Sequence, residues 1–139
     1  MIRIMISLVL LVTGNAIGQN TKENLVEITA EVINVRNEQG TVNFALYDEE
    51  GFMKEILQAK SSEIKEGHAT VTFEGVTSGT YAIICFHDEN GNQRMDFETN
   101  GMPIEDYGVS NNDMGFGPPQ FDTSKFDVDN EDLHLKIKF

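Results

Sequence analysis

Short segments with alternating apolar and polar residues dominate this sequence and limit what it can fold into. Side chains alternate between the two faces of a strand, so a segment with a period of two buries one face. Six segments are strand candidates of this kind or are more uniformly apolar: residues 25–35, 41–47, 68–73, 81–86, 121–128 and 133–139. Glycine and asparagine turns separate most of them, which is typical of antiparallel sandwiches. We therefore predict an all-β fold, an antiparallel β-sandwich of about seven strands.

Two further stretches bear on this fold. Residues 52–64 leave two local structures open, since Phe52, Ile56 and Ala59 fit a helical turn, whereas residues 57–60 fit a short edge strand. Tyr81 stands at the entry to the most apolar segment. A tyrosine in this position commonly covers one end of a sandwich core, and we expect that role for its ring.

The N-terminus has the three parts of a secretory signal peptide. A basic start at Arg3 precedes a short apolar stretch, and small residues at Ala16 and Gly18 provide a cleavage site. The apolar stretch is too short to span a bilayer. We therefore expect residues 1–18 to be removed, residues 19–139 to form one domain without a membrane span, and the protein to be exported to the periplasm or the extracellular space.

Acidic residues greatly outnumber basic ones. The chain has 23 Asp and Glu against ten Lys and Arg, and removal of Arg3 with the leader leaves nine bases and a net charge of −14. A surface of this sign repels phosphate backbones and anionic lipids, so nucleic acid and direct membrane binding are poor candidates. Divalent cations and an unknown protein or glycan partner remain, and we expect a monomer.

Residues 87–120 interrupt the strand pattern with a long polar segment, and we expect one ordered loop over this range. Loops of this length are uncommon in compact domains unless they are disordered or held in shape for a function. Residues 87–119 hold seven acids against a single base, Arg94. A bound cation would relieve the repulsion among these carboxylates.

The start of this loop has the spacing of a calcium site. Oxygen-bearing side chains recur at every second position from Asp88, and Gly91 lets the backbone curl around an ion. An EF-hand is excluded, because Gln93 and Thr99 occupy its glycine and bidentate glutamate positions. The hypothetical calcium ligands, with Arg94 giving its carbonyl, are Asp88, Asn90, Asn92, Arg94, Asp96 and Glu98. The alternative is that the first three side chains only cap turns through their own backbone.

The later part of the loop interleaves prolines, glycines and aromatic residues between residues 101 and 119. Such segments often pack on themselves as compact surface loops. Two interpretations of Tyr107 and Phe116 therefore stay open. They form an exposed aromatic binding surface, or they pack with Phe121 as the loop's own small core, which is the simpler interpretation.

A metal-assisted hydrolase is an alternative function, in which His87 acts with Asp88 or Glu105. Zinc would need further His or Cys residues at short spacing, and the other two histidines are scattered. The one cysteine, Cys85, lies in an apolar segment where a core side chain belongs. The sequence has no Gly-x-Ser-x-Gly, His-Glu-x-x-His or phosphate-loop motif. We therefore expect no catalytic residues.

Several motifs in the second half of the chain resemble those of a known family. They are Gly79-x-Tyr81-Ala82, Phe86-His87-Asp88-x-Asn90-Gly91-Asn92, Gly101-x-Pro103-x-Glu105-x-Tyr107-Gly108 and Phe116-Gly117-Pro118-Pro119-x-Phe121. Their order resembles that of domain-of-unknown-function family 2141, which consists of secreted bacterial proteins. The resemblance runs from about Val26 to the C-terminus and implies no established activity. Members often have a second glycine after Asn92, where this chain has Gln93.

The loop also resembles loops of immunoglobulin-like sandwich domains of the transthyretin-like and surface-adhesin B types, some of which hold calcium there. Together these features favour a secreted, non-catalytic binding or accessory module with a calcium-ordered loop. A third interpretation is a purely structural domain, in which turns and aromatic contacts hold the loop without a metal.

Overall fold

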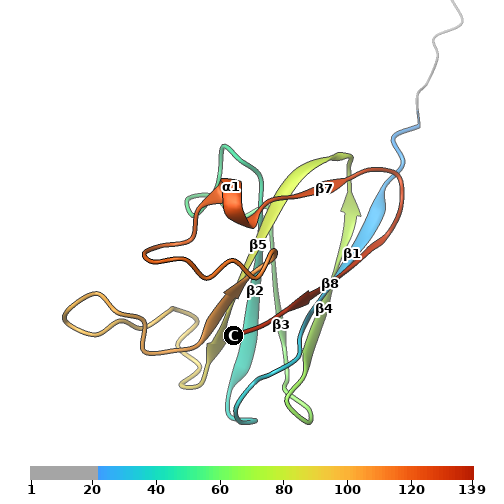
Figure 1. Ribbon diagram of the computed structural model, residues 1–139. Coiled ribbons are helices and arrows are strands. Elements are labelled where there is room, and N and C mark those ends of the chain that lie inside the picture. The colour runs from blue at the N-terminus through green and yellow to red at the C-terminus, as the bar shows by residue number, and fades with distance from the viewer. Residues whose placement is uncertain (1–21) are drawn as a thin grey trace, which may run out of the picture.

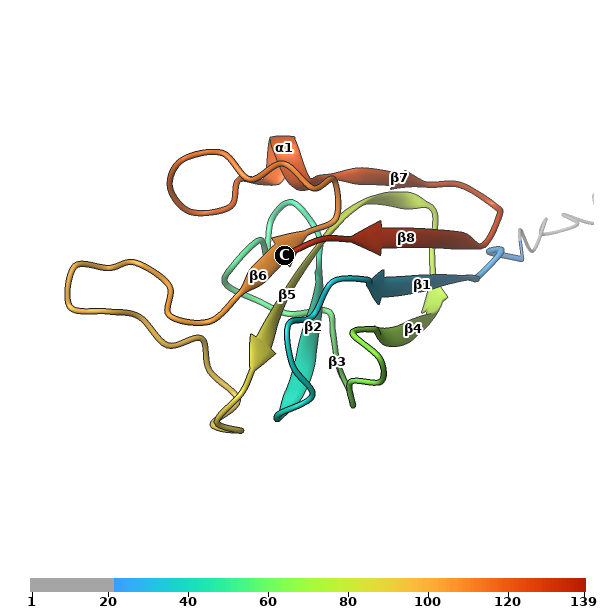
Figure 2. The ribbon, with the colours of Figure 1, turned by 60° about the horizontal axis from the view of Figure 1, so that its bottom comes forward.

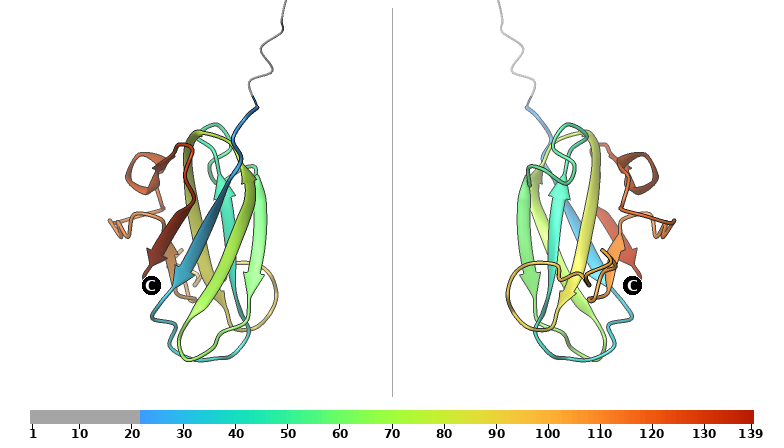
Figure 3. Two further views of the ribbon diagram at one scale, coloured as in Figure 1. Left: turned by 90° about the vertical axis from the view of Figure 1, so that its right-hand side faces the viewer. Right: turned by 90° about the vertical axis from the view of Figure 1, so that its left-hand side faces the viewer.

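The computed structural model describes residues 22–139, which fold into two β-sheets packed face to face (Figure 1). Figure 3 presents the two layers from the side. The prediction of an all-β sandwich is confirmed. The predicted signal peptide, residues 1–18, lies outside the described residues.

The smaller sheet has three strands in the order β4-β1-β8. Its central strand, β1 (Val26–Val32), is antiparallel to β4 (Ala69–Val76) and parallel to β8 (Leu133–Ile137). A parallel pair needs a long connection, and here nearly the whole domain separates β1 from β8. The period-two pattern could not reveal this one parallel pair, because side chains alternate in the same way in both orientations.

The larger sheet has the order β3-β2-β5-β6, and β7 also pairs with β5. β5 (Gly79–Asp88) is the longest strand and pairs along most of its length with β2 (Thr41–Tyr47). The remaining strands of this sheet are short: β3 (Gln58–Ser62), β6 (Tyr107–Val109) and β7 (Phe126–Val128). Because β5 carries three partners, its C-terminal end is a fixed base for the polar loop that follows.

The core lies between the sheets, where the alternation places it. Every second residue of β1 and of β2 is buried. The largest fully buried side chains of the apolar core are Phe44, Phe73, Ile28, Leu46, Ile83 and Ile137. Tyr81 packs against this core, and its hydroxyl donates to the backbone oxygen of Thr77 at 2.9 Å. Cys85 is a core residue, and burial raises the pKa of its thiol far above the ordinary value.

Three local predictions need comment. Of the two structures left open for residues 52–64, the edge strand is present, because β3 pairs with β2, while residues 49–54 form a turn. The strand expected over residues 121–128 is wrong in its first half, since α1 (Phe121–Ser124) is one helical turn before β7. No helix in residues 22–139 has the length and apolar character of a membrane span.

The single loop expected over residues 87–120 is wrong in its middle, because β6 pairs with β5 there. β6 leaves two separate segments, which we name the arm (residues 89–106) and the rim loop (residues 110–120). Both project from the same side of the sandwich in Figure 1 and in the tilted view of Figure 2. The fold thus brings two irregular segments together at one side of β5.

Candidate functional site

Asp88 fixes the start of the arm at the end of β5. Its side chain is buried, with 1% of the residue exposed. The carboxylate accepts hydrogen bonds from the backbone N–H of Asn92 at 3.2 Å and of Gln93 at 2.8 Å, and from the side-chain amide of Asn43 at 3.1 Å. These bonds turn the chain sharply after the strand, since two of the donors lie four and five residues further on.

The next oxygen-bearing side chains gather around Asp96. The amide nitrogen of Asn90 donates to the Asp96 carboxylate at 2.6 Å, and that of Asn92 donates to both of its oxygens at 2.9 Å. The amide oxygens of the same two asparagines accept the backbone N–H of Asn92 and of Arg94. The turn-capping interactions proposed as the alternative are therefore present, and they hold Asp88, Asn90, Asn92 and Asp96 in one cluster.

Glu105 is the residue of this cluster that the calcium spacing missed. One carboxylate oxygen, Oε2, accepts the backbone N–H of Asp96 at 3.2 Å. The other, Oε1, is buried and has no hydrogen-bond partner in the part of the chain that the structure describes. Burial raises the pKa of this carboxyl most, and the negative charges of Asp96 and Asp88 raise it further, while the backbone N–H groups of Asp96 and Glu89 lower it.

A small hairpin brings Glu105 back to Asp96. Phe97 forms a bridge with Pro103, and the N–H of Ile104 donates to the backbone oxygen of Asp96 at 2.9 Å. Glu105 therefore lies at the base of the hairpin. The one sequence signal for the position of Glu105 is the turn at Gly101, which pairs the segment around Phe97 with the segment around Pro103.

One of the predicted ligands, Glu98, is placed away from the cluster. Glu98 lies in the turn at the tip of this hairpin, where Gly101 donates to its backbone oxygen, and its side chain is exposed. Arg94, whose carbonyl is the predicted ligand, lies in the turn of the cluster and donates its backbone N–H to the Asn92 side chain. No hydrogen bond among residues 22–139 joins the Glu98 side chain to the Asp96 cluster.

The cluster is not a metal site made of charged ligands alone. Within residues 22–139, no three His, Cys, Asp or Glu side chains converge in a way that could hold a metal ion. The amide groups of Asn90 and Asn92 contact the Asp96 carboxylate instead. An amide oxygen has two lone pairs, and only one is used here by a backbone N–H. A cation at this position would therefore need amide oxygens as well as carboxylates.

His87 lies apart from this cluster. Its ring is completely buried, with Nε2 2.6 Å from the backbone oxygen of Gln39 and Nδ1 3.7 Å from the Glu89 carboxylate. Because neighbouring residues of a strand point to opposite faces, its ring and the Asp88 carboxylate face different ways. The described residues thus give the hydrolase hypothesis no open cleft at His87.

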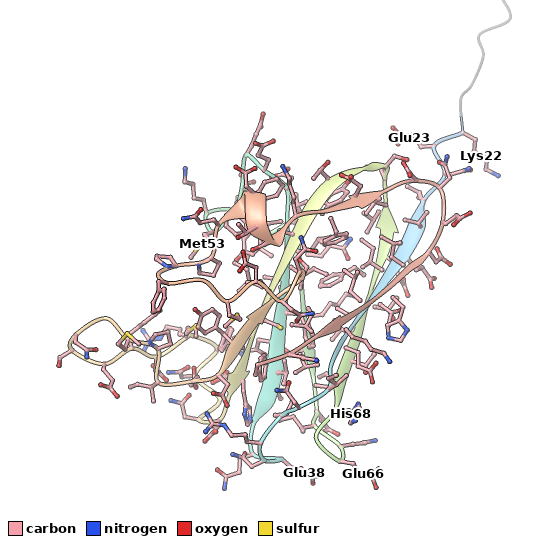
Figure 4. The ribbon with its side chains drawn as sticks, viewed as in Figure 1. Lys22, Glu23, Glu38, Met53, Glu66 and His68 are labelled. Atoms are coloured by element: carbon pink, nitrogen blue, oxygen red, sulfur yellow. The ribbon has the colours of Figure 1, made fainter. Side chains whose placement is uncertain are left out.

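The two histidines that look scattered in the sequence both contact Glu31. His68 Nδ1 lies 2.9 Å from one carboxylate oxygen and His134 Nε2 lies 3.2 Å from the other. These contacts lower the pKa of Glu31, the hydrogen bond with His68 most of all. His68 lies near Glu38 and Glu66 at the lower end of the sandwich in Figure 4, away from the projecting segments.

The small-core interpretation is wrong for Phe116, whose side chain is fully exposed at 110%. Tyr107 is partly buried in β6. Phe121 does pack, since its ring meets Phe52 edge to face at 5.6 Å, and Phe52 meets Tyr47 at 5.7 Å. Phe121 therefore anchors α1, whereas Phe116 is exposed to solvent on the rim loop.

These observations define a class of protein: a small β-sandwich domain whose central strand leads into an elaborate, hydrogen-bonded polar arm. A family model described as "Uncharacterized protein conserved in bacteria (DUF2141)" matches residues 30–136. The chain belongs to this family, as the motifs predicted. No curated protein matches the sequence significantly.

Two solved structures of one protein share limited similarity with the chain. They are structures of the pilus-presented adhesin Spy0125 (Cpa), one of a cysteine-to-alanine mutant and one in another crystal form. Each has 12% sequence identity and a TM-score of 0.26, with 84% of this chain covered. The chain spans about a quarter of the adhesin chain, 26% of its length. A likeness this low supports no conclusion about function.

Gln93 is expected to be a strained position. Its φ of 62° lies in the left-handed region, which a non-glycine residue rarely adopts. Replacing it with glycine should stabilise the protein by about 0.5 to 1 kcal/mol, and replacing it with valine should destabilise it by about 1 to 2 kcal/mol. Urea unfolding would measure both changes. Glu66→Gly, at φ 51° in a distant turn, is the matched control and should be stabilised by a similar amount, because it relieves the same kind of strain. A loss of stability in Gln93→Gly would contradict the assignment of strain.

Proposed function

We propose that this protein is an exported, non-catalytic binding module in which one calcium ion orders the arm and fixes the surface that a partner meets. The observation that carries the proposal is the buried Oε1 of Glu105, which has no well-formed hydrogen bond within residues 22–139, with only the Glu89 N–H near the carboxyl and the negative charges of Asp96 and Asp88 acting on it. A buried carboxylate oxygen without a partner is costly. A cation would satisfy it and would offset the negative charges of Glu105 and Asp96.

The ligand set follows from the cluster. Calcium takes six to eight oxygens at about 2.3 to 2.6 Å. The arm offers carboxylates from Asp88, Asp96 and Glu105, amide oxygens from Asn90 and Asn92, and the Arg94 carbonyl. Glu105 takes the place first assigned to Glu98. Affinity in the range typical of extracellular modules, about 10⁻⁴ to 10⁻³ M, fits a site built partly from neutral oxygens.

An ion in this position would join three parts of the chain. Asp88 belongs to the end of β5, Asn90 to Asp96 form the first turn of the arm, and Glu105 immediately precedes Asp106 and β6. Asp106 is itself fixed by a forked ion pair with Arg36. The base of the arm would then be held on both sides, so that the position of its tip depends on calcium.

Thermal unfolding in millimolar calcium and in chelator tests this proposal. For millimolar affinity we expect calcium to raise the melting temperature by roughly 5 to 10 °C, because the ion binds only the folded state. Glu105→Gln should lose this response. In chelator it should melt at or above the wild-type temperature, because its neutral amide no longer leaves a buried charge unpaired.

Glu98→Gln is the matched control, since it removes the same charge from the exposed tip of the arm. It should keep the calcium response. Identical melting of the wild type in calcium and in chelator would remove the ion from the proposal. A full calcium response in Glu105→Gln would remove Glu105 from the assigned site. Only the first result would favour the purely structural interpretation of the arm.

A further inference from the structure

An apolar groove lies between the arm and the rim loop. It has a volume of about 480 Å³, and its walls come from the hairpin of the arm, the rim loop and the turn before β3. The side chains that define it are Met53, Met95, Phe97, Met102, Tyr107 and Phe116. Met102, Phe97 and Met53 are each more than half exposed, and Phe116 is fully exposed. Met53, labelled in Figure 4, marks the side of the groove nearest α1.

All four methionines of residues 22–139 lie at this surface. Three of them line the groove, and the fourth, Met114, lines a smaller pocket that adjoins it on the rim loop. The core cluster of the described residues contains none. Methionine is flexible and polarizable, and it suits surfaces that must fit apolar side chains of several shapes. Exposed apolar side chains that gather around a groove in this way are typical of interaction surfaces.

The segments around the groove are strongly acidic. Residues 51–55, 89–106 and 110–120 together carry seven acidic side chains and two basic ones, Lys54 and Arg94. Glu98 stands between Phe97 and Met102 in the hairpin turn, and Asp113 lines the adjoining pocket. A partner that fills the groove therefore meets apolar walls with negative charge beside them.

We propose that this groove is the docking site for a cationic amphipathic segment of a partner protein, with apolar side chains between Lys or Arg residues. The inference rests on the proposed binding function and does not require calcium. Apolar side chains enter between the hairpin and Phe116, and the basic residues pair with Glu98 and Asp113. Charge complementarity selects this occupant, since a second copy of this acidic chain or an anionic membrane would be repelled.

A synthetic amphipathic helix of leucine and lysine is a suitable probe. Carbon-13 labelling of the methionine methyl groups places reporters at the groove, and the signals of Met53, Met95, Met102 and Met114 should shift on titration with the peptide. Phe116→Ser and Met102→Ser should each weaken binding at least about tenfold, through loss of apolar contact area. Both side chains are exposed, so these variants should fold normally.

Leu25→Ser is the matched control, because Leu25 is 61% exposed just before β1 and should not affect the peptide. Glu98→Gln combined with Asp113→Asn should weaken binding and reduce its dependence on salt. The proposal is overturned if a leucine and glutamate peptide binds equally well, or if Phe116→Ser binds as the wild type does.

Two further measurements separate this inference from its alternatives. Binding to phosphatidylcholine vesicles that Phe116→Ser abolishes, without binding to the peptide, would replace the protein partner with a membrane surface. Repeating the titration in calcium and in chelator separates the groove from the ion. If the peptide binds in both media and calcium does not affect melting, the docking site is supported and the calcium site is not. If calcium affects melting but the peptide does not bind, the docking site is overturned and the calcium site stands.

Discussion

Replacing Gly40 with alanine should destabilise the protein by about 3 kcal/mol or more, through left-handed backbone strain and overpacking together. Gly40 has a φ of 67°, and a Cβ atom there would lie 2.0 Å from the backbone oxygen of Asp88 and 2.9 Å from the Cα of Glu89. Backbone atoms cannot rotate away as a side chain can. The turn before β2 or the end of β5 must therefore move, and the change should be clear in both urea and thermal unfolding.

Gly75→Ala is the matched control for this change. Gly75 has the same φ of 67°, but a Cβ atom there would meet nothing within 4 Å. Its replacement should cost only the left-handed strain of about 1 to 2 kcal/mol. The difference between the two variants isolates the close approach of the turn to Asp88. Equal losses of stability in both would contradict that explanation.

Asp88→Ala should cost about 3 kcal/mol and lower the melting temperature by roughly 10 °C, because it removes the buried acceptor of three partly buried hydrogen bonds. The donors are two backbone N–H groups, of Asn92 and Gln93, and the amide of Asn43. The loss should appear in chelator as well as in calcium, since these bonds do not involve an ion. Thermal unfolding in both media measures it.

The matched control for this variant is Asp48→Ala. Asp48 follows β2 as Asp88 ends β5, but its carboxylate accepts only one of the hydrogen bonds found here, from the N–H of Gly51 at 2.8 Å. Its loss should cost about 1 kcal/mol. If the two variants were equally destabilised, the three-donor cluster at Asp88 would not be the anchor of the arm.

The alternation of apolar and polar residues predicted those strands whose formation depends on residues close in the sequence. β2 matches its predicted range from Thr41 to Tyr47, because one buried face and two flanking turns define it without help from distant residues. β6 has three residues and is defined by its pairing with β5, so the alternation of apolar and polar residues could not reveal it. The helical turn of α1 likewise depends on a distant contact, that of Phe121 with Phe52.

The same difference between short-range and long-range interactions decides which residues of the candidate site could be predicted. The curl from Asp88 to Asp96 could be read from alternating side chains, because each interacts with backbone a few residues away. Glu105 could not, because it reaches Asp96 only when the hairpin of the arm folds back. The exposure of Phe116 could not be predicted from the sequence either, because an aromatic residue between glycines is equally compatible with burial in the loop and with an exposed contact surface.

The parallel pairing of β1 with β8 has a consequence for how the protein is made. The first strand cannot complete its sheet until β8 leaves the ribosome, so the two halves of the domain cannot fold one after the other. Contacts between sequence-distant strands also make folding slow. We expect the nascent polypeptide to stay open until β8 has been synthesised, a state that would suit the proposed export.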